Sequence, residues 1–133
     1  MRQRTVMVAE DSPVIRKLIG MCLRGFAAEV LEVADGIAAV EQASRLSPDV
    51  LILDVGLPGK DGWTVLRELR AQPATLDLPV LMLTGHSSES DRRKAEAIGV
   101  SGFMTKPFQP NELRDAVQAL VPLDTSVPIE HAN

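Results

Sequence analysis

The chain has 133 residues, 45% of them hydrophobic, which is the size and composition of one domain with a single core. Its 14 basic and 18 acidic residues give a formal charge of −4, which argues against direct binding of DNA. The single cysteine, Cys22, cannot form an internal disulfide, and no leader-like or membrane-spanning run occurs, so we expect a cytoplasmic protein without membrane insertion.

Five short runs of β-branched or aliphatic residues recur along the chain, and each is too short for a buried helix. They predict strands at residues 5–9, 30–34, 50–55, 80–83 and 102–105. A stretch with helical spacing of apolar residues follows each run. The predicted buried faces of these helices are Val14, Leu18, Met21 and Cys22; Ile37, Val40 and Leu46; Val65, Leu66 and Leu69; Ala95 and Ile98; and Leu113, Val117 and Leu120.

The strands suit a parallel sheet, because the run at residues 50–53 is apolar throughout and would be covered on both faces. With right-handed crossovers, we predict an α/β, flavodoxin-like doubly wound (βα)5 fold with strand order 2-1-3-4-5. Ser12 before Pro13 predicts a helix start, and Gly99 predicts a helix end. We expect one domain over residues 1–121, and a tail over 122–133, which lacks periodicity.

Polar residues follow the predicted strands at the edge where ligands bind in such sheets. Glu10 and Asp11 follow the first strand, Asp54 ends the third, Thr84 the fourth and Lys106 the fifth. Each alone is usually a cap or a solvated turn residue. Converging carboxylates, however, repel one another by roughly 4 kcal/mol at about 4 Å and an effective dielectric near 20, so a hard cation such as Mg²⁺ is implied.

Four stretches carry a resemblance to a known family: residues 8–11, 51–62, 83–85 and 103–108. Taken in order, at strand ends and with helix-length spacers, they resemble the receiver domain of bacterial response regulators over about residues 5–121. The resemblance implies that Asp54 accepts a phosphoryl group from phosphohistidine. It also implies that Asp11, Asp54 and the Gly56 carbonyl bind Mg²⁺, while Glu10 holds a metal-bound water.

The same resemblance assigns a switch. Lys106 would pair with a phosphoryl oxygen, and Thr84 would donate its hydroxyl to the phosphoryl group after moving with its loop. Phe103 stands where the family has an aromatic that turns inward, although it could equally be a simple core residue. The Lys106-Pro107 bond resembles one that is often cis. The residues that tune phosphoryl lifetime would be Gly56 and His86, and a glycine there suggests a moderate to long lifetime.

The resemblance also implies partners: a histidine kinase or histidine phosphotransfer protein upstream, and a protein partner downstream. We expect kinase docking on an exposed apolar patch of Ile15 and Ile19. Ser101 and Gly102 stand where many transcription-factor receivers have acids of a dimer interface, so we expect a monomer or weak dimer. Because only a short tail follows the predicted domain, we expect a stand-alone domain that acts through a partner. Output would use the surface around Arg92, Arg93, Lys94, Phe103 and Arg114, although the basic run could equally be a solvated helix face.

Particular residues disfavour three other functions, and we expect no enzyme activity beyond self-phosphorylation and dephosphorylation. Aspartyl phosphatases of similar fold resemble one another in having a second Asp two residues after the nucleophile. This chain has Gly56 at that position. A degenerate receiver would lack site residues that are all present here. A flavin carrier is disfavoured because Glu10 and Asp11 would repel its phosphate. Trp63 and Cys22 are interpreted as packing residues.

Overall fold

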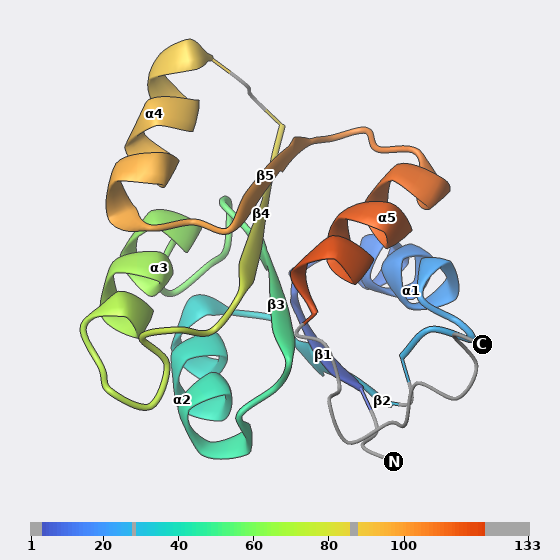
Figure 1. Ribbon diagram of the computed structural model, residues 1–133, viewed down its shortest axis with the longest axis horizontal. Helices are drawn as coiled ribbons and strands as arrows, with labels where there is room; N and C mark the ends of the chain where they lie inside the picture. Colours follow the sequence, from blue (N-terminus) through green and yellow to red (C-terminus); the bar gives the residue numbers. More distant parts are fainter. Residues whose placement is uncertain (1–3, 28, 86–87, 122–133) are drawn as a thin grey trace, which may run out of the picture.

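The computed structural model describes residues 4–27, 29–85 and 88–121. Strands and helices alternate along this part of the chain, as predicted (Figure 1). In chain order they are β1 (Thr5–Ala9), α1 (Pro13–Cys22), β2 (Glu29–Val33), α2 (Gly36–Leu46), β3 (Val50–Asp54), α3 (Gly62–Arg70), β4 (Val80–Thr84), α4 (Glu89–Ile98), β5 (Gly102–Thr105) and α5 (Pro110–Leu120). The predicted strand ends were wrong by one residue at β2, β3 and β4.

The strands form one parallel sheet in the order β2-β1-β3-β4-β5, which confirms the predicted topology. Helices α1 and α5 cover one face, and α2, α3 and α4 cover the other (Figure 1). Every residue of β3 and β4 is buried, as expected for strands covered on both sides. Successive strand residues therefore pack into two hydrophobic cores, one on each face of the sheet. Ile52 packs on the side of α1 and α5, and Leu53 packs on the opposite side.

Helix ends agree with the capping signals in the sequence. The Ser12 hydroxyl accepts a hydrogen bond from the Ile15 N–H at 3.3 Å, and Pro13 occupies the first turn. Ser47 and Gly99 end α2 and α4 with φ values of 48° and 108° in the left-handed region. These caps fix where each helix starts relative to the strand ends.

The predicted buried face of α1 was wrong. Ile19 is fully buried and packs with Leu23 between α1 and the sheet, whereas Val14 is 77% exposed. The predicted docking patch of Ile15 and Ile19 is therefore corrected: Ile19 cannot contact a partner, and Ile15 is half-buried. The physical reason is that the apolar stripe of α1 is wider than the part that packs on the sheet, so spacing alone does not select which edge of the stripe is buried.

Helix α2 shows a similar difference. Ile37 and Leu46 are exposed, whereas Val40 and the small residues Ala39 and Ala43 are buried. Small side chains let α2 approach the sheet closely, so they occupy the inner face in place of the larger residues. The predicted faces of α3, α4 and α5 are confirmed. Buried residues on these faces are Val65, Leu66, Leu69, Ala95, Leu113 and Val117, and Ile98 and Leu120 are half-buried against the cores.

Candidate functional site

The residues predicted to form a site converge at the carboxyl edge of the sheet. Asp54 and Thr84 are the last residues of β3 and β4, and Glu10 and Lys106 directly follow β1 and β5. The Lys106 N–H donates to the Thr84 carbonyl at 2.7 Å, which ties the ends of β4 and β5 together. The Lys106-Pro107 peptide bond is cis, as the resemblance suggested. The strand pairing thus places side chains distant in sequence at one edge.

Three carboxylates form the centre of this edge. Glu10, Asp11 and Asp54 can each place an oxygen within 4.8 Å of the others. Glu10 is 2% exposed and Asp54 6% exposed, whereas Asp11 is open to solvent. Buried like charges repel strongly unless a cation lies among them. An all-oxygen set with one open side suits Mg²⁺, which binds a few carboxylates and keeps several waters.

Lys106 supplies a positive charge to two of these acids. Its Nζ lies 2.7 Å from Oδ1 of Asp54 and donates to Oε1 of Glu10 at 2.9 Å. Burial lowers the pKa of Lys106, but the hydrogen bonds and charges of Asp54 and Glu10 outweigh that effect and leave its pKa raised. The ammonium group is therefore held in its charged form beside Asp54.

Glu10 is fixed from two further directions that the sequence did not reveal. The Ser12 N–H donates to Oε2 of Glu10 at 3.0 Å. Arg16 donates from a terminal guanidinium nitrogen to the backbone carbonyl of Glu10 at 2.7 Å, and from Nε to Oε1 of Glu32 at 3.0 Å. The signal for Arg16 was its place one turn into α1, because helical side chains lean toward the N-terminus.

Glycines shape the loop that follows Asp54. The Gly62 N–H donates to the Val55 carbonyl at 2.7 Å, which closes the loop between β3 and α3. A Cβ at Gly56 would lie 3.7 Å from Oδ2 of Asp54, an ordinary contact distance. Residue 56 therefore faces the carboxylate, and a side chain there would reach it.

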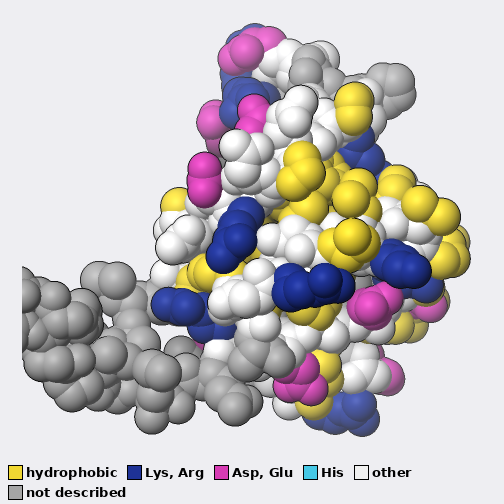
Figure 2. Space-filling view, turned by 90° about the vertical axis from the view of Figure 1, so that its right-hand side faces the viewer, with side chains coloured by type: hydrophobic (Ala, Val, Ile, Leu, Met, Phe, Trp, Pro, Cys, Tyr) yellow, Lys and Arg dark blue, Asp and Glu magenta, His cyan; other side chains and the backbone are white. Residues whose placement is uncertain are grey.

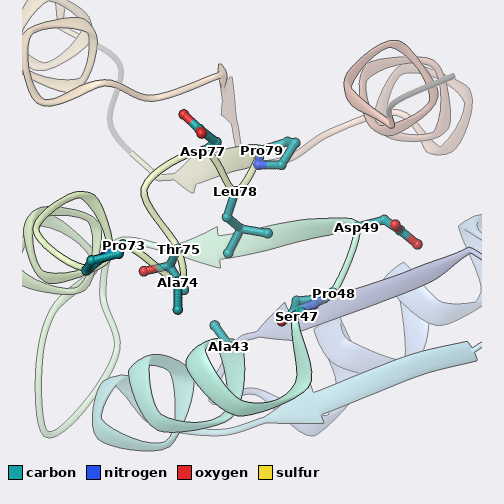
Figure 3. A pocket seen from close by; sticks show the side chains of 10 residues that line it. All are labelled: Ala43, Ser47, Pro48, Asp49, Pro73, Ala74, Thr75, Asp77, Leu78 and Pro79. Carbon is teal, nitrogen blue, oxygen red and sulfur yellow. The ribbon is translucent and has the colours of Figure 1, made fainter.

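A second buried acid lies beside β3, at the opposite edge of the sheet. Asp49 directly precedes β3, and its Oδ2 accepts a hydrogen bond from the Thr5 N–H at 2.8 Å. It borders a cleft of about 290 Å³ between the end of α2 and the segment before β4 (Figure 3). Asp49 thus joins the amino ends of β1 and β3 and lies away from Lys106 and the acidic cluster.

Comparison with known proteins decides the family. The model of the response regulator receiver domain matches residues 6–118. This chain belongs to that family. Its members are phosphoacceptors of two-component systems.

Individual relatives agree with this assignment. The chain is 40% identical to the transcriptional regulatory protein CreB of Escherichia coli over 91% of this chain and 52% of CreB. It spans about half the length of the curated relatives it matches. The chemotaxis protein CheY4 of Vibrio cholerae superposes with a TM-score of 0.83 at 31% identity, covering 90% of this chain and 100% of CheY4.

A third relative bears on the metal. The receiver domain of the sensor histidine kinase PA1611 of Pseudomonas aeruginosa is 33% identical to this one, with a TM-score of 0.80. The match covers 90% of this chain and 98% of that domain, whose structure has a magnesium ion coordinated in the active-site cleft. Receiver domains bind Mg²⁺ in their acidic site, and the cluster described above is the acidic site of this one.

Phe103 of this receiver domain is half-buried on the α2, α3 and α4 side of the sheet. The guanidinium of Arg92 lies 5.3 Å from the centre of its ring, and this contact connects β5 to α4. Thr84 is buried at the end of the neighbouring strand. His86, the second predicted tuning residue, lies outside the described residues, as does the predicted tail.

Ser101 and Gly102 each make a local structural contact at the start of β5. The Ser101 hydroxyl accepts a hydrogen bond from the Val80 N–H at 2.9 Å. A Cβ at Gly102 would lie 3.0 Å from Leu81 and 3.5 Å from Leu120, so the glycine lets α5 lie close to the sheet. An acidic side chain at residue 102 would crowd these contacts. Among the described residues, no helix is long and apolar enough to cross a bilayer.

Proposed function

We propose that Asp54 is the phosphoacceptor of this receiver domain and takes its phosphoryl group from a phosphohistidine in a Mg²⁺-dependent step. The observation that carries the proposal is the position of its carboxylate, which ends β3 within the acidic cluster and contacts Lys106 at 2.7 Å. Asp49 is the other buried acid beside β3, but it lies at the opposite edge of the sheet, where its carboxylate accepts a hydrogen bond from the Thr5 N–H. The geometry therefore favours Asp54.

Each residue of the edge has a role in this transfer. A carboxylate oxygen of Asp54 forms the new bond to phosphorus, while the bond from phosphorus to the histidine nitrogen breaks and its electron pair stays on the imidazole. The Lys106 ammonium stabilises negative charge on the phosphoryl oxygens, and Thr84 donates its hydroxyl to them. Neither residue forms a covalent bond.

The acidic cluster would hold the metal. Asp11 and Asp54 would bind it directly with the carbonyl of Gly56, and Glu10 would hold a metal-bound water. Bound Mg²⁺ would offset the charge of the acids and of the incoming phosphoryl group. We propose no reaction of this chain on other substrates, since Gly56 provides no acid or base where related phosphatases have one.

Phosphorylation would switch the surface formed by α4, β5 and α5. It adds about −1.5 to −2 charges at the sheet edge. Thr84 ends β4 next to β5, so movement of Thr84 toward the phosphoryl group would make room for Phe103 to turn. Arg92 contacts the Phe103 ring, so this movement would change the exposed face of α4. We propose that a downstream protein in the cytoplasm binds this face and thereby detects phosphorylation.

The phosphodonor must approach the same edge, and an apolar groove beside Lys106 provides a docking surface. Ile15, Leu18, Pro107 and Phe108 line this groove of about 310 Å³ with Lys106. Hydrophobic side chains gather on the side of the molecule that carries α1 and α5, with Lys and Arg among them (Figure 2). Ile15→Ala should slow transfer from a kinase or phosphotransfer protein but not from acetyl phosphate. Equal slowing with both donors would refute docking.

Intact-mass measurement after incubation with Mg²⁺ and acetyl phosphate tests the phosphoacceptor. Wild type should gain the mass of one phosphoryl group, and Asp54→Asn should gain none. Asp49→Asn is the matched control, because it removes the other buried acid beside β3, and it should still be phosphorylated. Loss of phosphorylation in Asp49→Asn but not in Asp54→Asn would overturn the proposal. A wild type that gains no mass would indicate a degenerate receiver.

A further inference from the structure

Arg16 contacts the segment Glu10-Asp11, which carries two of the three acids of the cluster. The contact is to the backbone of this segment and not to a carboxylate. One guanidinium nitrogen donates to the backbone carbonyl of Glu10 at 2.7 Å. Its Nε donates to Glu32 on β2 at 3.0 Å, and the Arg16 side chain is only 18% exposed. The guanidinium is thus held between α1, β2 and the turn after β1.

Arg16 lies in the capped first turn of α1. Its backbone N–H donates to the Ser12 carbonyl at 3.0 Å, so it belongs to the first hydrogen-bonded turn of α1. That turn is capped by the Ser12 hydroxyl, and the Ser12 N–H itself donates to the Glu10 carboxylate. Backbone and side chain of Glu10 are therefore both tied to the start of α1. The planar guanidinium can hold two acceptors in fixed directions, which a lysine cannot do.

We propose that Arg16 is a positioning residue for the metal: it holds the Glu10-Asp11 segment in the conformation in which both carboxylates face Asp54. The inference rests on the proposed function of the acidic cluster. Without Arg16, the Glu10 carbonyl loses its charged donor, and the turn that carries Asp11 gains freedom. Mg²⁺ binding must then restrict that freedom, and its affinity falls.

Charge and geometry make opposite predictions for this residue. Arg16 is a cation close to a cation-binding cluster, so removal of its charge alone should tighten Mg²⁺ binding. Loss of positioning should weaken it instead. The direction of the change in Mg²⁺ affinity therefore separates the two roles, and it is measured without any phosphodonor.

Isothermal titration with MgCl₂ alone tests the proposal. For Arg16→Gln we expect a Kd for Mg²⁺ that is about tenfold higher, the lower end of the effect of residues that orient metal ligands. Lys17→Gln is the matched control, because it removes the same charge from an exposed neighbour on α1, and its Kd should stay the same or fall slightly. An Arg16→Gln variant that binds Mg²⁺ as tightly as wild type, or more tightly, would overturn the proposal.

A second variant guards against loss of folding. Arg16→Lys keeps the charge of residue 16, but an ammonium cannot hold the Glu10 carbonyl and Glu32 in fixed directions, so its Kd should rise by less than that of Arg16→Gln. A Kd for Arg16→Lys equal to that of wild type, with Arg16→Gln unfolded, would count against positioning. A wild type that binds no Mg²⁺ would refute the proposed metal site itself. If wild type and Arg16→Gln bind Mg²⁺ equally well, the metal site stands and only the role of Arg16 is refuted.

Discussion

Gly62 lies directly against the backbone of Asp54: a Cβ atom on Gly62 would come within 2.7 Å of the Asp54 carbonyl oxygen. It would also come within 2.7 Å of the Val55 Cα, and backbone atoms cannot swing away as a flexible side chain can. The start of α3 is thus packed onto the strand end that carries the candidate phosphoacceptor.

Gly62→Ala should therefore destabilise the protein and disturb the site. We expect a loss of about 1–3 kcal/mol in the free energy of unfolding, measured by urea denaturation, and slower phosphorylation by acetyl phosphate. Gly20→Ala is the control, because Gly20 lies inside α1 with open space around it. That change should raise stability by about 0.5–1 kcal/mol. A Gly62→Ala variant as stable as wild type would contradict the close packing.

Lys106→Met should make stability depend more strongly on Mg²⁺ than it does in the wild type. Removal of the ammonium leaves Asp54 and Glu10 buried without their cation, and we expect a loss of about 1–3 kcal/mol in Mg²⁺-free buffer. Saturating Mg²⁺ should recover much of this loss, and Mg²⁺ should bind more tightly than to wild type because no ammonium competes. Phosphorylation should still be lost. Urea denaturation with and without Mg²⁺ measures the effect, and an equal loss in both conditions would argue against it.

The sequence predicted the topology and the edge of the sheet because both follow from strong local signals. Strands of unbroken apolar residues required cover on both sides, and the residues directly after them had to meet at one edge. It could not predict which part of α1 is buried, since the apolar stripe of that helix is wider than its contact with the sheet, where Ile19 packs. For Arg16 the sequence offered only its place one turn into α1, because a contact with the Glu10 carbonyl leaves no side-chain pattern.

Asp61 should give the stability of α3 a pH dependence. The Thr64 N–H donates a hydrogen bond to Oδ1 of Asp61 at 2.8 Å, and this bond lowers the pKa of Asp61. Slight burial acts to raise the pKa, whereas the positive charges of Lys94 and Arg67 lower it further. Because the folded pKa is lowered, the stabilisation is complete above the unfolded pKa of about 3.9 and is lost as the pH falls through the folded value.

Two substitutions separate the cap from its charge. At pH 7, Asp61→Ala should cost about 1 kcal/mol, and Asp61→Asn less, since an amide oxygen still accepts from Thr64. Urea denaturation across acidic pH should show the difference between wild type and Asp61→Asn shrinking below about pH 4. A difference that stays constant down to the acid limit would show that the charge on Asp61 plays no part.

Gly56 makes the lifetime of the phosphorylated state testable. A Cβ at residue 56 would lie 3.7 Å from Oδ2 of Asp54, so an asparagine fits there without displacing the loop, and its amide could orient a water for attack on the phosphoryl group. Wild type lacks that group, so its phosphoryl group should decay slowly and Gly56→Asn should shorten the lifetime several-fold. Loss of the phosphorylated mass after removal of acetyl phosphate measures both rates.

Gly85→Ala is the control for a general effect of added atoms near the edge, because Gly85 follows Thr84 and is exposed with open space around it. Rapid decay in the wild type would show that water reaches the phosphoryl group without help from residue 56.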